Sequence, residues 1–135
     1  MRLLGVDFGG ARIGLATYET EFGVGRALPY LAATGTLAKD AVAISEIARR
    51  EDVVRVVIGL PLSQGEETKM SRVCRMLGDE VAGLGWDVAY VDEALTSQEA
   101  EAEMHRAGYK GSERRRRVDG EAALRILERF TIEGP

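Results

Sequence analysis

The chain has 135 residues, 45% of them hydrophobic and 30% charged, with a net charge of −4, a balance typical of one globular domain. No apolar run reaches the ~20 residues that cross a bilayer, and no signal segment opens the chain, so we expect a cytoplasmic protein with a single domain over residues 1–135. Because Cys74 and His105 are its only cysteine and histidine, an intrachain disulfide, a multi-cysteine zinc site and a His-rich site are excluded. Any metal site must therefore use carboxylates, which favours Mg²⁺ or Mn²⁺.

The first third of the chain predicts three strands. Leu3–Asp7 is a short apolar run typical of a buried central strand, and the alternating residues 12–19 predict a second strand. The turn between them is Gly9-Gly10-Ala11, which suits a hairpin because glycine tolerates positive φ. Residues 22–37 predict a third extended stretch, and Pro29 places it at an edge of the sheet.

The middle of the chain alternates helices with strands. Residues 38–50 predict an amphipathic helix, and the β-branched run Val53–Leu60 predicts a parallel strand covered on both faces. Apolar residues three and four apart predict a second helix over residues 66–84, with Cys74 packed in its buried stripe. Asp87–Val91 predicts another buried strand.

The last third predicts two helices with a basic segment between them. Thr96 opens a capping box that begins a helix ending at Ala107. Residues 106–117 carry six Arg or Lys against one Glu, which indicates either a solvated basic loop or a nucleic-acid-binding arm. Apolar residues over 122–130 predict the final helix. An antiparallel opening followed by βαβ crossovers predicts an α/β fold, with a mixed five-stranded sheet flanked by helices.

Acidic residues lie where two of the predicted strands end. Asp7 ends the first strand, and Asp92 and Glu93 follow the last; sites in open α/β sheets form outside the carboxyl ends of strands. Asp119 lies on the face that the final helix presents to the sheet, near its N-terminal end. Any one of these acids alone fits a helix cap or a loop. Together they predict a site for two divalent cations that clamp a reacting phosphodiester.

The glycine-rich stretch Asp7–Gly14 also allows a different interpretation. Phosphate-binding hairpins of the actin and sugar-kinase type have a similar opening, so a nucleotide-phosphate enzyme is a further hypothesis. Chain length counts against it, because those sites lie between two related domains. The dinucleotide-binding fingerprint fits poorly, since a strand and not a helix follows the glycines.

Four segments, in order and at natural spacing, carry a resemblance over nearly the whole chain: VDFGGARIG (Val6–Gly14), VVIGLPLSQGEE (Val56–Glu67), VDEALTSQEAE (Val91–Glu101) and RRRRVDGEAALRIL (Arg114–Leu127). Together they resemble the YqgF/RuvX family of Holliday junction resolvases, also described as pre-16S rRNA nucleases. The resemblance implies a ribonuclease H-like fold and metal-dependent cleavage of structured nucleic acid.

By position, the resemblance implies that Asp7, Glu93 and Asp119 are the catalytic carboxylates that bind Mg²⁺ or Mn²⁺. Asp92 is a fourth candidate ligand. It also implies nucleic-acid contacts at the rim of the site from two polar residues, Arg12 and Thr96. The family's arginine after the acid pair is Ala94 here, so any phosphate contact from that position is absent.

We therefore expect a metal-dependent endonuclease that acts in pre-16S rRNA 5′-end processing, in Holliday junction resolution, or in both. Its partner would be a structured RNA precursor or branched DNA, and nucleases of branched substrates often work as homodimers. The arginines Arg114, Arg115, Arg116 and Arg117 would neutralise backbone phosphates in a salt-dependent way. The alternative is a non-catalytic nucleic-acid-binding or ribosome-assembly factor with the same fold, to which Ala94 lends weight.

Overall fold

The protein is seen here in a computed structural model that describes residues 1–93 and 111–133, with side chains from residue 120 onward in the second segment. The predicted helix over residues 96–107 lies outside the described residues. The described elements, in chain order, are β1 (Arg2–Phe8), β2 (Arg12–Glu19), β3 (Val24–Ala32), α1 (Leu37–Arg50), β4 (Arg55–Leu60), α2 (Lys69–Gly83), β5 (Val88–Asp92) and α4 (Gly111–Glu133).

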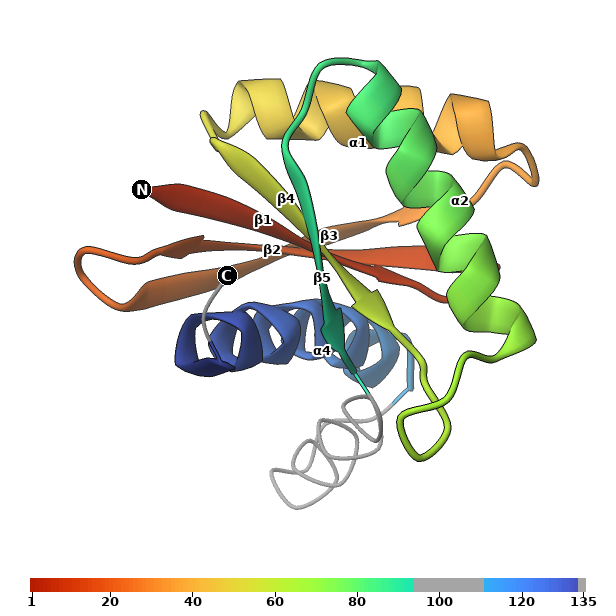
Figure 1. The fold of residues 1–135 in the computed structure, drawn as a ribbon. Coiled ribbons are helices and arrows are strands. Elements are labelled where there is room, and N and C mark those ends of the chain that lie inside the picture. The colour runs from red at the N-terminus through yellow and green to blue at the C-terminus, as the bar shows by residue number, and fades with distance from the viewer. Residues whose placement is uncertain (94–110, 134–135) are drawn as a thin grey trace.

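The strands form one five-stranded sheet in the order β3-β2-β1-β4-β5. β1, β2 and β3 pair antiparallel, whereas β4 lies parallel to both β1 and β5. Helices α1 and α2 cover one face of this sheet and α4 covers the other (Figure 1). The predicted mixed α/β sheet is confirmed, and β3 lies at an edge, as Pro29 indicates.

The core has two halves, one on each face of the sheet. Alternate residues of β1 point to opposite faces, so Leu4 and Val6 pack against α1 and α2 while Leu3 packs against α4. Gly5 shares the α4 face, and a Cβ there would lie 2.7 Å from the backbone oxygen of Ala123. The helix therefore sits directly on the backbone of β1, and Asp7 comes next on that same face.

The turn between β1 and β2 meets the start of α2. Gly10 has a φ of +87°, a conformation that glycine adopts without strain, and Met70 lies 3.5 Å from the position of an added Cβ. Thr68 and Ser71 form a capping box at the start of α2, and the Thr68 hydroxyl donates to the carbonyl of Pro61, at 2.8 Å. The loop after β4 is thereby held beside the hairpin, at the end of the sheet where Asp7 lies.

Three expectations from the sequence are corrected. β5 is a half-buried edge strand and not a fully buried one, because only β4 pairs with it. The third extended stretch ends at Ala32, and Leu37 already begins α1. The basic segment is helical from Gly111, so Arg114–Arg117 lie within α4; serine, glutamate and arginine sustain a helix where no proline or turn signal interrupts it.

This extension of α4 also changes the place of Asp119. The residue lies eight positions after Gly111, in the interior of the helix, and so it is not an N-terminal cap. The apolar stripe after it, including Ala122, Ile126 and Leu127, is fully buried, as predicted. Cys74 is likewise buried in the core of the other face. Within the part of the chain that the structure describes, no helix is long and apolar enough to cross a membrane.

Candidate active site

Two carboxyl groups from distant parts of the chain meet at one end of the sheet. Asp7 is the next-to-last residue of central strand β1, and Glu93 directly follows edge strand β5. Strand β4 lies between these two strands, yet Glu93 lies over Gly59 of β4 and the carboxyl group of Asp7 is close enough to raise the pKa of the Glu93 carboxyl. The Glu93 side chain therefore reaches across β4 to the central strand.

Gly59 of β4 makes this reach possible. A Cβ at Gly59 would lie 3.0 Å from both Cβ and Cδ of Glu93 and 2.5 Å from Cδ1 of Ile126. Glu93 and the α4 side chain thus occupy the space over the backbone of β4. The backbone N–H of Glu93 donates to the Leu60 carbonyl, at 3.0 Å, which continues the β4–β5 pairing by one residue.

Burial and proximity both disfavour a charge on Glu93. Its side chain is only 8% exposed, and the pKa of its carboxyl is raised to about 10, chiefly by burial and then by the hydrogen bond and charge of Asp7. The charge of Asp92 raises this pKa further, whereas that of Arg129 lowers it. The Glu93 carboxyl group therefore favours its protonated form.

The donor set fits a hard divalent cation. Mg²⁺ and Mn²⁺ take carboxylate oxygens as ligands, and a cation would replace the proton that burial favours on Glu93. Among the side chains that the structure describes, no three His, Cys, Asp or Glu residues gather closely enough to hold a metal. Asp7 and Glu93 are brought together, Asp92 lies beside them as the last residue of β5, and the Asp119 side chain is outside the described set.

The nearby thiol does not take part in this chemistry. Cys74 of α2 is fully buried, and burial, with added effects of the charges on Glu93 and Asp7, raises its pKa to about 12. A thiol with so high a pKa is inert as a nucleophile or metal ligand near neutral pH. The predicted packing role of Cys74 is confirmed by its place in the core.

Of the predicted nucleic-acid contacts, the structure describes the side chain of Arg12. Arg12 begins β2 on the face that carries Asp7, because Asp7 pairs with Gly14. Its guanidinium lies 5.7 Å from the centre of the Tyr30 ring, a partner that sequence reasoning missed. Thr96 lies outside the described residues, and Arg114–Arg117 lie on α4 with side chains outside them.

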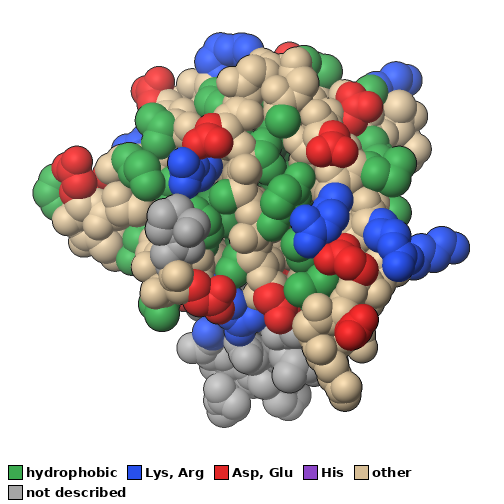
Figure 2. Space-filling model, in the orientation of Figure 1, with side chains coloured by type: hydrophobic (Ala, Val, Ile, Leu, Met, Phe, Trp, Pro, Cys, Tyr) green, Lys and Arg blue, Asp and Glu red, His purple; other side chains and the backbone are tan. Residues whose placement is uncertain are grey.

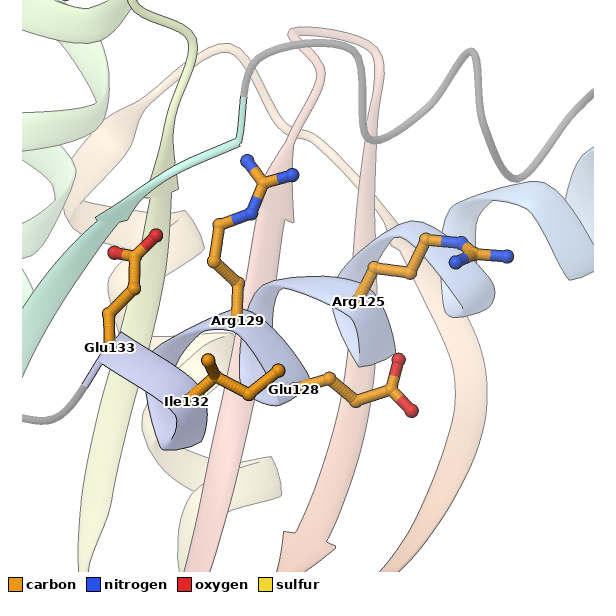
Figure 3. A pocket seen from close by; sticks show the side chains of 5 residues that line it. All are labelled: Arg125, Glu128, Arg129, Ile132 and Glu133. Carbon is orange, nitrogen blue, oxygen red and sulfur yellow. The ribbon is translucent and has the colours of Figure 1, made fainter.

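Arg129 was also missed by sequence reasoning. Its Nη1 donates to the backbone carbonyl of Asp92, at 2.6 Å, so α4 is bonded to the end of β5. Figure 3 shows the Arg129 side chain extending from α4 towards that strand end, beside a cavity of about 290 Å³. The cavity is lined by Arg125, Glu128, Arg129, Ile132 and Glu133. The sequence offers only a weak signal for this role, namely an arginine beside the buried stripe of the helix.

Acidic and basic side chains come together at this end of the molecule. In the space-filling view they lie side by side at the lower end of the face shown, where the ribbon places the end of β5 (Figures 1 and 2). Two carboxyl groups, one of them buried, beside an arginine are suited to a cation and to an anionic substrate at once. Metal-assisted chemistry on phosphate esters is the chemistry that such a site supports best.

Comparisons with known proteins agree with this arrangement. A family model described as RuvX, Holliday junction resolvase, matches residues 1–132. A protein of Anaeromyxobacter dehalogenans (strain 2CP-1) named "Putative pre-16S rRNA nuclease" is 42% identical over 130 residues, covering 95% of this chain and 94% of that protein. One of the same name in Opitutus terrae is 38% identical over 135 residues, covering 96% and 90%.

A solved structure gives the same fold. The chain of "T. thermophilus RuvC in complex with Holliday junction substrate" matches with a TM-score of 0.57 and 15% identity, covering 99% of this chain and 96% of that one. At this identity the likeness shows the fold alone. The fold is therefore the ribonuclease H-like fold that the family resemblance implies.

Proposed function

The chain belongs to the RuvX family of Holliday junction resolvases and is a nuclease, and from this premise we propose that it is a divalent-metal-dependent endonuclease. In this proposal Asp7, Glu93 and Asp119 bind Mg²⁺ or Mn²⁺, with Asp92 as a further candidate ligand. The observation that carries it is the place of Glu93, which is buried over Gly59 of β4, next to the strand that bears Asp7, and whose pKa Asp7 helps to raise. Two acids held this close, one of them buried, are costly without a cation.

The chain's own residues have distinct tasks in this proposal. Glu93 gives up its proton, and Asp7 and Glu93 present carboxylate oxygens from the ends of β1 and β5. When bound, two divalent cations would supply an activated water and stabilise the charge on the attacking and leaving oxygens. The side chain of Glu93 excludes solvent from the floor of the site, because it covers the backbone of β4 at Gly59.

The proposed substrate is structured nucleic acid, either the 5′ region of a pre-16S rRNA or branched DNA. The curated relatives are named for the first, and the RuvC structure that shares the fold holds a Holliday junction. We propose that Arg12, Thr96 and Arg114–Arg117 contact its phosphates. Such contacts position the substrate without reading its sequence, and they weaken as salt is added.

Cleavage of both substrates under single-turnover conditions in Mn²⁺ tests the proposal. We expect the wild type to cut at least one, and Asp7→Asn and Glu93→Gln to bind the substrate without cutting it. Glu46→Gln, which alters an exposed glutamate on α1, is the matched control and retains activity. Equal background cleavage by all four proteins, with binding retained, would contradict the enzyme and favour the non-catalytic binding factor.

We propose further that residues 1–135 work as a single domain in the cytoplasm, and as a homodimer on branched substrates. Support for one domain is that α4 packs on β1, β2 and β3, so that both halves of the chain share a core. A four-way junction has two strands to cut, which suits two copies of the chain. Sedimentation with and without a junction measures this, and one copy per junction would contradict the dimer.

A further inference from the structure

The peptide unit between Asp92 and Glu93 is held from both of its sides. Its N–H donates to the Leu60 carbonyl of β4, at 3.0 Å, and its carbonyl accepts from Nη1 of Arg129 on α4, at 2.6 Å. Because a peptide unit is planar, two bonds at opposite ends of it fix the orientation of the plane. That orientation sets the direction in which the Glu93 side chain leaves the backbone.

The second bond is needed because of where this peptide lies. β5 is an edge strand, paired with β4 on one side only, and Glu93 comes one residue after its end. Strand ends fray when one neighbour alone holds them. The Arg129 side chain is partly buried and supplies the missing support from the helix that covers this face of the sheet (Figure 3).

We propose that Arg129 is a positioning residue, which holds the carbonyl before Glu93 so that the Glu93 carboxylate is aimed at the metal site beside Asp7. This inference rests on the proposed metal-dependent function. Arg129 bonds to the backbone and not to the carboxylate, so it acts through Glu93. An arginine reaches across from α4 with several N–H donors in a fixed plane, and a charged donor makes a short, strong bond to a carbonyl.

The charge of Arg129 also acts on the metal site directly, in the opposite direction to its positioning of Glu93. The positive charge of Arg129 repels a divalent cation, so a variant without that charge would bind the cation more tightly if electrostatic repulsion were its main effect. If positioning is its main effect, the same variant binds the cation more weakly. Partners that orient a metal ligand are worth roughly 10–100-fold in metal affinity or activity.

The experiment measures Mn²⁺ affinity by calorimetry in Arg129→Gln, Arg129→Lys and a matched control, Arg55→Gln. Arg55 is a partly buried arginine whose Nε binds Asp87, at 2.7 Å, just before the other end of β5. The control therefore removes the same charge and a bond near the same strand, but far from Glu93. Metal-free thermal unfolding is recorded for all three variants, and calorimetry is run well below each Tm.

We expect Arg129→Gln to weaken Mn²⁺ binding by about tenfold, with kcat lowered and KM for the nucleic acid unchanged. Arg129→Lys keeps a charged donor and recovers part of the affinity, and Arg55→Gln binds Mn²⁺ as the wild type does. Unchanged or tighter Mn²⁺ binding by Arg129→Gln, no recovery with lysine, or an equal loss in Arg55→Gln would each overturn the proposal. Asp7→Asn separates this proposal from the proposed function. If Asp7→Asn loses Mn²⁺ binding, the metal-dependent function stands even where the role of Arg129 is overturned. If Asp7→Asn binds Mn²⁺ and cleaves nucleic acid as the wild type does, the metal-dependent function itself is overturned.

Discussion

The central strand β1 and the edge strand β5 each bring one carboxyl group to the site, and they hold it by different means. β1 has neighbours on both sides, paired with β2 along its whole length and with β4 over Leu3–Val6, and α4 lies directly on its backbone at Gly5. β5 is paired on one side, half-buried, and ends just before Glu93. Asp7 is fixed by the fold as a whole, whereas Glu93 depends on a few local contacts. Apart from those of the two carboxylates themselves, substitutions in β1 should therefore mainly lower the stability of the fold, whereas substitutions near the end of β5 should mainly lower activity.

The largest effect is expected on the cleavage rate, when either of the two carboxylates is removed. Asp7→Asn and Glu93→Gln each remove a proposed metal ligand, and the loss of several kcal/mol of transition-state stabilisation lowers the cleavage rate by about 10³-fold. Single-turnover cleavage in saturating Mn²⁺ measures this. A loss at Asp7 with none at Glu93 would show that the edge strand contributes no ligand.

The next largest effect is a loss of stability when the packing of α4 on β1 is disturbed. Gly5→Ala forces a Cβ to 2.7 Å from the Ala123 backbone oxygen and from Leu127 Cγ, and overpacking against backbone destabilises the fold by about 3 kcal/mol. Urea unfolding without metal measures this. Gly83→Ala, at the end of α2, is the control, because nothing lies within 4 Å of an added Cβ there and its φ is not positive.

Gly59→Ala makes the matching test at the edge. The added Cβ meets the side chains of Ile126 and Glu93, which can move, so we expect a destabilisation of about 1 kcal/mol, smaller than at Gly5. Displaced Glu93 then lowers activity by about 10²-fold, since small misplacements of a catalytic group are costly. A variant that unfolds as easily as Gly5→Ala, with full activity in its folded fraction, would contradict the contrast between the strands.

The titration of Glu93 gives a further test. Its pKa is raised from 4.5 to about 10 in the metal-free fold, so the folded state keeps a proton that the unfolded chain loses above pH 4.5. The resulting stabilisation is complete below pH 4.5 and is lost as the pH rises towards 10. Mn²⁺ requires the carboxylate, so its affinity rises over the same window and binding releases about one proton.

Calorimetry in buffers of different ionisation enthalpy counts that proton. Glu93→Gln abolishes the release, and in metal-free protein it flattens the fall of stability between pH 5 and pH 9. Mn²⁺ affinity that does not change with pH in the wild type would contradict a protonated Glu93 at this site.

The smallest effect is expected on the other side of β5. The Arg75 guanidinium of α2 lies 5.2 Å from the centre of the Tyr90 ring and binds Glu67 at the surface. Arg75→Gln removes an exposed contact and lowers the Tm by no more than about 2–4 °C. Mn²⁺ affinity stays that of the wild type, because Tyr90 lies three residues before Glu93; a tenfold loss would show that this contact also positions the site.

The contrast between the strands also explains which parts of the site can be read in the sequence. Asp7 stands out because an apolar run ends in an acid and two glycines, and local patterns of this kind predict a central strand and its turn. Asp92 and Glu93 stand out equally by pattern. The family resemblance favours Glu93, and only the fold shows that Glu93 is the one that reaches Asp7 over Gly59.

The contacts that support Glu93 could not be predicted in this way. Gly59 lies in a strand rich in β-branched residues, and nothing in that local pattern marks it as the residue over which Glu93 packs. Arg129 bonds to a carbonyl 37 residues earlier in the chain. Neither contact leaves a periodic pattern. The helical state of Arg114–Arg117 was missed for a related reason: a run of like charges is typical of a loop, yet the packing of the apolar residues after Asp119 carries the helix through it.

The packing of α4 on β1 has a consequence for when the enzyme becomes active. α4 is translated after every strand of the sheet, and it is the helix whose buried side chains complete the core on the face that carries Asp7. Until this helix docks, Glu93 lacks Arg129 and Leu3 lacks its cover. A nascent chain that has emerged only as far as β5 therefore lacks the contacts that hold Glu93 in the proposed metal site, so we expect no cleavage activity before α4 is complete.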